Sequence, residues 1–182
     1  MSIEICETCS NYGSHSAYDA VSYIRQDTTP EDFDKHRQKY WPEYELVDGG
    51  RCGWNVMGQA AYTGNVELVE HLYKLEGARL VNLGNEFGMT PLYCAVIGGQ
   101  LATATKLIEL GAKVNLATRS SCSDSWFGDT ASCSTPLWKA LNIKTHVIPE
   151  MVKLLLKHGG IVSPSLGEVQ SKLLAEIQAN PL

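Results

Sequence analysis

The chain has 182 residues, 44% of them hydrophobic, and a formal net charge of −5. A chain of this length buries roughly 70% of its unfolded surface, so it does not need disulfides or metals to fold. The acidic balance argues against nucleic acid or an anionic membrane as partner. No basic segment followed by an apolar core opens the chain, and no apolar run approaches the roughly 18 residues of a membrane span. We therefore expect a cytoplasmic protein.

Residues 1–50 are predicted to form a helical lobe. Two segments have helical spacing, Ala17 to Arg25 and a helix capped by Thr29. Their apolar or stack-facing residues are Tyr18, Val21 and Ile24 on the first, and Phe33, His36 and Tyr40 on the second. The lobe is expected to cap the following residues or to form a degenerate repeat of its own.

Residues 88–115, GMTPLYCAVIGGQLATATKLIELGAKVN, contain two short amphipathic helices. Thr90 is a typical N-cap, and Pro91 then occupies the first helical position, where its missing N–H is harmless. Gly98-Gly99 ends the first helix, and Gly111 supplies the left-handed residue that commonly follows the second. These signals predict one complete helix-turn-helix repeat.

The same order of signals recurs on both sides of this segment. Upstream, a helix from Asn55 to Gly64 and a second from Val66 to Tyr73 match it, although Asn and Val replace the Thr-Pro start. Downstream, Thr135-Pro136-Leu137 restarts the pattern and Gly159-Gly160 ends it. We expect repeats at about 52–83, 84–116 and 117–163, which together form a domain at 51–163.

An insertion lies between the second and third repeats. Asn82 to Thr90 spans eight positions, whereas Asn115 to Thr135 spans 20. Because insertions in repeat proteins fall at loops, residues 116–134 are predicted to form a protruding finger. Residues 164–182 then predict a terminal capping helix with Ser163 or Ser165 as its cap, and with one apolar face comprising Val169, Leu173, Leu174 and Ile177.

The Thr-Pro-Leu openings at 90 and 135 and the glycine stops at 111 and 159 resemble the ankyrin repeat family. The resemblance covers about residues 52–163. It implies an all-α solenoid of about three repeats that binds a protein partner through its finger loops and the inner surface of the first helices. Tyr93 and Trp138 depart from the family, which usually has His after Thr-Pro-Leu. Function depends on sites carried by the scaffold, so the resemblance does not identify the partner.

Several residues are candidates for binding that partner. Trp126 and Phe127 lie adjacent in the polar finger, where exposed aromatics often become interface anchors. The alternative is that Trp126 folds back on Trp138 or on the edge of a repeat. The inner-face candidates are Gln59, Tyr62, Tyr93, Ile97, Trp138 and Asn142, and the other finger loops add Arg79, Glu86 and Phe87. We expect a monomeric adaptor, or a host-directed effector of an intracellular microbe that acts in the host cytosol.

A second function class rests on the cysteines of the N-terminal lobe. Cys6 and Cys9 supply half of a tetrahedral zinc site, with His15, His36 and Cys52 as irregularly spaced further ligands. A thiol site of Cys52, His36 and Asp48 is the corresponding catalytic alternative. Because motifs for phosphate binding, metalloproteases and serine hydrolases are absent, we expect no catalysis and no cofactor. Cys122 and Cys133 either cross-link the finger or, in the reducing compartment that we expect, have no structural role.

Overall fold

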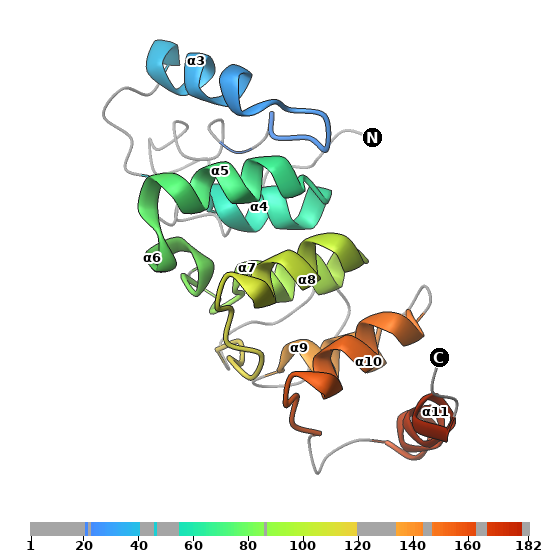
Figure 1. Cartoon of the computed structure of the whole chain (residues 1–182). Coiled ribbons are helices and arrows are strands. Elements are labelled where there is room, and N and C mark those ends of the chain that lie inside the picture. Colours follow the sequence, from blue (N-terminus) through green and yellow to red (C-terminus); the bar gives the residue numbers. More distant parts are fainter. Residues whose placement is uncertain are drawn as a thin grey trace, which may run out of the picture.

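The computed structural model describes residues 21, 23–40, 46, 55–85, 87–119, 134–143, 147–162 and 167–179. These residues form nine α-helices and no β-strand, which confirms the predicted all-α class (Figure 1). In chain order they are α3 (Pro30–Tyr40), α4 (Val56–Thr63), α5 (Val66–Glu76), α6 (Ala78–Val81), α7 (Pro91–Ile97), α8 (Leu101–Glu109), α9 (Pro136–Leu141), α10 (Pro149–Lys157) and α11 (Glu168–Ala179). None of the helices in these ranges is long and apolar enough to cross a membrane.

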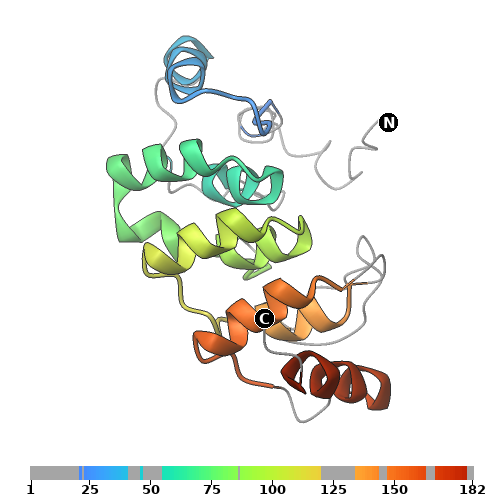
Figure 2. The same cartoon turned by 45° about the vertical axis from the view of Figure 1, so that its right-hand side comes forward.

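Helices α4 to α10 form a stack of helix pairs, α4 with α5, α7 with α8 and α9 with α10. First helices pack on first helices, from α4 through α7 to α9, and second helices pack on second helices, from α5 through α8 to α10. Figure 2 shows the pairs in one row, with α3 at one end and α11 at the other. Each pair contributes an apolar stripe to one continuous core, which includes Leu68, Leu72, Leu92, Leu107, Leu137 and Leu155.

Side chains cap all three first helices. The side-chain oxygens of Asn55, Thr90 and Thr135 each accept a hydrogen bond from the amide three positions on, at 2.6, 3.3 and 3.2 Å. Pro91 and Pro136 occupy the first helical positions, as predicted. Asn55 departs from the Thr-Pro pattern but starts a regular helix, because asparagine is as good an N-cap as threonine.

A repeated asparagine joins each repeat to the next. Asn82 Nδ2 donates to Gly111 O (3.1 Å), and Asn82 Oδ1 accepts from Lys113 N (2.7 Å). Asn115 makes the same pair of bonds with the loop after α10, at 2.8 and 2.9 Å. Both amide groups therefore bind the backbone of the following repeat and hold the loops in register.

Among the described residues of the N-terminal part, Pro30–Tyr40 form helix α3, and the predicted first helix does not extend to Arg25. Val21, Ile24 and Phe33 are buried, as predicted. Tyr23 lies in a turn and Ile24 and Arg25 in irregular backbone, so a helix running to Arg25 is wrong. Residues 17–20 lie outside the described residues. His71 on α5 lies 3.0 Å from a carboxylate oxygen of α3, which ties α3 to the stack.

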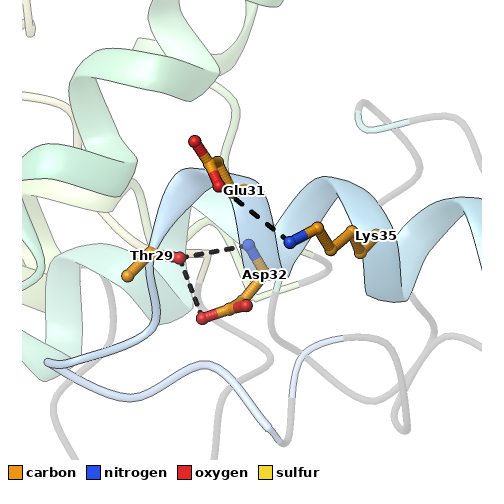
Figure 3. Close-up of polar contacts among 4 residues, drawn as sticks. All are labelled: Thr29, Glu31, Asp32 and Lys35. Atoms are coloured by element: carbon orange, nitrogen blue, oxygen red, sulfur yellow. Dashed lines mark hydrogen bonds and ion pairs between the residues drawn. The ribbon is translucent and has the colours of Figure 1, made fainter.

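Thr29 caps α3, in agreement with the prediction (Figure 3). Its Oγ1 accepts from Asp32 N (3.1 Å) and donates to Asp32 Oδ2 (2.8 Å). Glu31 pairs with Lys35 one turn on, at 4.0 Å between Oε2 and Nζ. The first turn of α3 is thus held by local polar contacts. Its acidic residues also interact favourably with the positive N-terminal end of the helix dipole.

The C-terminal helix α11 packs against α9 and α10, but not with the whole predicted face. Leu174 and Ile177 are buried and Leu173 is half-buried, whereas Val169 is 74% exposed. Val169 lies in the first turn, beyond the surface that the third repeat covers. The helix begins at Glu168, and the predicted caps Ser163 and Ser165 lie outside the described residues.

Candidate protein-recognition surface

Three half-exposed apolar side chains lie on successive first helices. Tyr62 and Ile97 each stand seven positions after their helix caps, and Trp138 stands three positions after its own cap. Positions three and seven lie one turn apart on the same helix face, and α4, α7 and α9 pack in order. Tyr62 is 38% exposed, and the other two are half-buried. We call these three residues the inner row.

Polar contacts border the inner row at both ends. Gln59 Nε2 donates to Ile24 O at 3.4 Å, which links α4 to the N-terminal part. Gln170 Nε2 donates to Asn142 Oδ1 at 3.0 Å, which links α11 to the end of α9. Gln59 and Asn142, both inner-face candidates, are therefore half-buried residues that join the stack to its two ends.

The loop between the first and second repeats is shaped by one buried side chain. Asn85 Oδ1 accepts from Phe87 N and from Met89 N, each at 2.9 Å. The backbone closes the same turn, with Asn85 N donating to Met89 O at 3.1 Å and Gly88 at φ +75°. Phe87 is half-buried on this turn, and Glu86 lies outside the described residues. The turn is thus held by its own hydrogen bonds.

Thr118 and Ser134 close the base of the insertion, and we call this pair the neck. Thr118 N donates to Ser134 O, and Ser134 N donates to Thr118 Oγ1, both at 3.0 Å. Both residues are buried. The chain therefore leaves and returns at one place, as expected of a finger, although the predicted anchors Trp126 and Phe127 lie outside the described residues.

The neck lies against the first loop. Arg119 N donates to Phe87 O at 2.8 Å. A Cβ atom on Gly88 would stand 3.0 Å from Arg119 N and 3.3 Å from Thr118 Cα, so only glycine permits this approach without displacement. Asn85, Phe87, Gly88, Thr118 and Arg119 form one continuous unit, which we call the finger-loop surface.

This repeated architecture agrees with a comparison of the sequence with known families. A family model described as ankyrin repeats (3 copies) matches residues 15–118, more than half of the chain. The chain belongs to the ankyrin repeat family. The match begins upstream of residue 52 and takes in part of the N-terminal lobe, while α9 and α10 lie beyond its end. Ankyrin repeats are generally protein–protein interaction modules.

Tyr93 does not face a partner in this ankyrin stack. Its side chain is only 2% exposed, and its Oη lies 2.6 Å from Ser134 Oγ. The predicted inner-face role needs an accessible ring, so the structure places Tyr93 in the core and we remove it from the recognition surface. The contact is tertiary, because Ser134, which bonds the buried hydroxyl, lies 41 positions further along the chain.

Arg79 lies on α6, the short helix formed by the longer loop of the first described repeat. Its side chain is 72% exposed, with Nη1 3.8 Å from Glu76 Oε2. The sequence indicated extra loop residues here but not a helix. Leu80 and Val81 are fully buried on α6, so this turn is anchored by apolar packing and presents Arg79 to solvent.

The alternative metal or thiol sites rest mostly on residues that the structure does not describe. Cys6, Cys9, His15, Asp48 and Cys52 lie outside the described residues, so these sites stay predictions. His36 packs against Tyr23 with ring centroids 3.9 Å apart and ring planes tilted by 35°. Burial together with the nearby Lys39 ammonium lowers the pKa of His36. Within the described ranges, no three potential metal-ligating side chains lie together.

An open cavity of about 500 Å³ lies beside α3. It is lined by Tyr23, Asp27, Thr28, Asp32, Lys35, His36 and Lys39. Acidic and basic groups are mixed in this lining, which gives the cavity no marked preference for an anion or a cation.

Cys94, the one cysteine within the described ranges, is unsuited to nucleophilic chemistry. It is buried between α4 and α7, and burial raises the pKa of its thiol to about 12. A thiol with this pKa stays protonated at neutral pH, whereas the thiolate is the reactive form. We assign Cys94 to the core.

Proposed function

We propose that the protein is a non-catalytic cytoplasmic adaptor that binds a partner protein through the finger-loop surface and the inner row. The observation that carries the proposal is the hydrogen bond from Arg119 N to Phe87 O, reinforced by the close approach at Gly88. It joins two neighbouring loops into one platform instead of two independent strips of backbone.

Preorganisation favours such a platform as a binding site. A partner binds more weakly to a loop that must first become ordered, because the loop then loses conformational entropy on association. Here the Asn85 side chain is 3% exposed and holds the turn around Phe87 through two hydrogen bonds. The neck holds the neighbouring loop in the same way.

The side chains of this surface are of the types found at protein interfaces. Aromatic residues and arginine are enriched at interfaces, and a few of them supply most of the binding energy. Arg119 is exposed, Phe87 and Trp138 are half-buried, and Tyr62 is 38% exposed. Trp126 and Phe127 follow Arg119 within the same insertion, and we include them, with Glu86 and Arg79, among the proposed contacts.

The first experiment identifies a partner and then maps its site. Partners are captured on the immobilised full chain and identified by mass spectrometry, and the dissociation constant is measured by calorimetry with purified partner. We expect Phe87→Ala or Trp138→Ala to weaken binding about tenfold or more, the range of an interface anchor. Replacing residues 120–132 by a short Gly-Ser linker, which keeps Thr118 and Ser134, tests Trp126 and Phe127.

Leu75→Ala is the matched control, because Leu75 is an apolar side chain 46% exposed on α5, a second helix. It should change the dissociation constant less than twofold. Equal losses for Leu75→Ala and Phe87→Ala, or no loss for any surface variant, would contradict the proposed site. A partner from the same organism indicates an adaptor, and one from a host cell indicates an effector.

A further inference from the structure

Three hydroxyl groups, two of them from the neck, form a buried chain. Tyr93, Ser134 and Thr118 are 2%, 3% and 5% exposed. Ser134 Oγ lies 2.6 Å from Tyr93 Oη and 3.3 Å from Thr118 Oγ1. Tyr93 belongs to α7, whereas the other two are the neck residues that close the base of the insertion.

Core packing alone does not account for the tyrosine hydroxyl. A buried hydroxyl costs free energy unless it is hydrogen-bonded, and a phenylalanine would fill the same volume without that cost. The separation of 2.6 Å is at the short end for O–H···O hydrogen bonds. The bond therefore serves to fix Ser134, which occupies the returning end of the insertion, relative to α7.

The bonded chain continues outward to the recognition surface. Ser134 pairs with Thr118 through backbone and side chain, and the next residue, Arg119, donates to Phe87 O. The path from the buried Tyr93 hydroxyl to the half-buried Phe87 is thus an unbroken series of direct contacts between described residues.

We propose that Tyr93 is a positioning residue for partner recognition: its hydroxyl latches the neck to α7 and so fixes the geometry of the finger-loop surface, without contacting the partner. The role in recognition rests on the proposed function, whereas the latch itself is a property of the free protein. The two parts are therefore tested separately.

The latch is tested by amide hydrogen exchange, followed by NMR on the full chain. Tyr93→Phe removes one hydroxyl and keeps the ring. We expect the amides of Thr118, Arg119 and Ser134 to exchange about tenfold faster, because each opens locally when the latch is lost. Amides of α5 and α8 should keep their wild-type rates.

Tyr73→Phe is the control, since Tyr73 is a half-buried tyrosine on α5 that makes no hydroxyl hydrogen bond within the described part of the chain. Unchanged neck amides in Tyr93→Phe would overturn the latch. A uniform rise across α5, α7 and α8 would also overturn it, because that result means general destabilisation. Ser134→Ala removes the other side of the bond and must reproduce the Tyr93→Phe pattern.

The role in recognition is tested with the partner identified above. Tyr93→Phe should raise its dissociation constant by about 2- to 10-fold, the effect of ordering a few side chains and a loop on binding. The thermal midpoint should stay near that of Tyr73→Phe. Faster neck exchange with unchanged affinity would confine Tyr93 to a structural role, and failure to find any partner would count against the proposed function but leave the exchange result intact.

Discussion

Lys106 Nζ on α8 lies 2.9 Å from Glu70 Oε1 on α5 and thereby joins the second helices of two neighbouring repeats. The same ammonium lies 3.2 Å from Glu109 Oε2, one turn along α8. A single lysine therefore bridges two carboxylates across the outer layer of the stack. The stability that this arrangement contributes should depend on pH.

Lys106→Met should lower the thermal midpoint by about 1–3 °C at neutral pH, the scale of an exposed ion pair. The hydrogen bond from Lys106 and its charge lower the pKa of Glu70, while hydrogen bonds to Glu70 and Glu109 raise the pKa of Lys106. The stabilisation is therefore complete above the ordinary carboxyl pKa of 4.5 and below the ordinary lysine pKa of 10.5. It is lost as pH falls through the lowered Glu70 pKa, or rises through the raised Lys106 pKa.

The check is calorimetry of the wild type and Lys106→Met from pH 3 to pH 8. Lys35→Met is the control, since its ion pair with Glu31 is more exposed and longer, at 4.0 Å. A difference between the wild type and Lys106→Met that persists unchanged at the lowest pH would exclude the ion pair as its cause.

Gly98→Ala should destabilise the fold by about 1–3 kcal/mol, the usual effect of overpacking. Gly98 has φ −72°, which suits alanine, but an added Cβ would overlap the backbone carbonyl of Tyr62 and stand 3.2 Å from Gln100 Cγ. Urea denaturation measures the effect. Gly111→Ala is the comparison variant, because it tests backbone conformation without a steric clash. A Cβ there meets no atom within 4 Å, whereas φ is +94°. A wild-type midpoint for Gly98→Ala would refute the tight contact.

Thr103→Val should leave the stability unchanged or raise it by up to about 1 kcal/mol. Thr103 is 1% exposed on α8, and its hydroxyl has no hydrogen-bond partner in the part of the chain that the structure describes. Thr105→Val on the same helix is the matched control, because Thr105 Oγ1 donates to Leu101 O at 2.9 Å. Chemical denaturation should show that Thr103→Val is more stable than Thr105→Val. The reverse order would show that the Thr103 hydroxyl is hydrogen-bonded.

Asn82→Ala should lower the free energy of unfolding by about 1–2 kcal/mol, because two hydrogen bonds between repeats are lost. Gln178→Ala, at an exposed position on α11, should change it by less than about 0.5 kcal/mol. Denaturant titrations compare the two variants. If both variants lose equally little free energy of unfolding, the Asn82 side chain does not hold the repeats in register.

Local signals in the sequence were sufficient for the repeats themselves. The caps at Thr90 and Thr135, the prolines that follow them and the left-handed Gly111 act within one helical turn, so each is readable without knowledge of the rest of the chain. Apolar periodicity likewise placed Leu92 and Leu107 in the core. The fold class and the insertion follow from such short-range chemistry and from spacing.

Tertiary structure decided which of the candidate residues are accessible. Tyr93 and Trp138 stand at the same position of their repeats, yet Tyr93 is buried and bonded to Ser134, 41 residues away, whereas Trp138 is half-buried. Val169 satisfies helical periodicity but projects beyond the third repeat. The hydrogen bond from Arg119 to Phe87 forms only because two loops 32 positions apart in the sequence meet at Gly88. Burial and loop contact depend on which distant segment packs nearby, and periodicity within one segment carries no information about that.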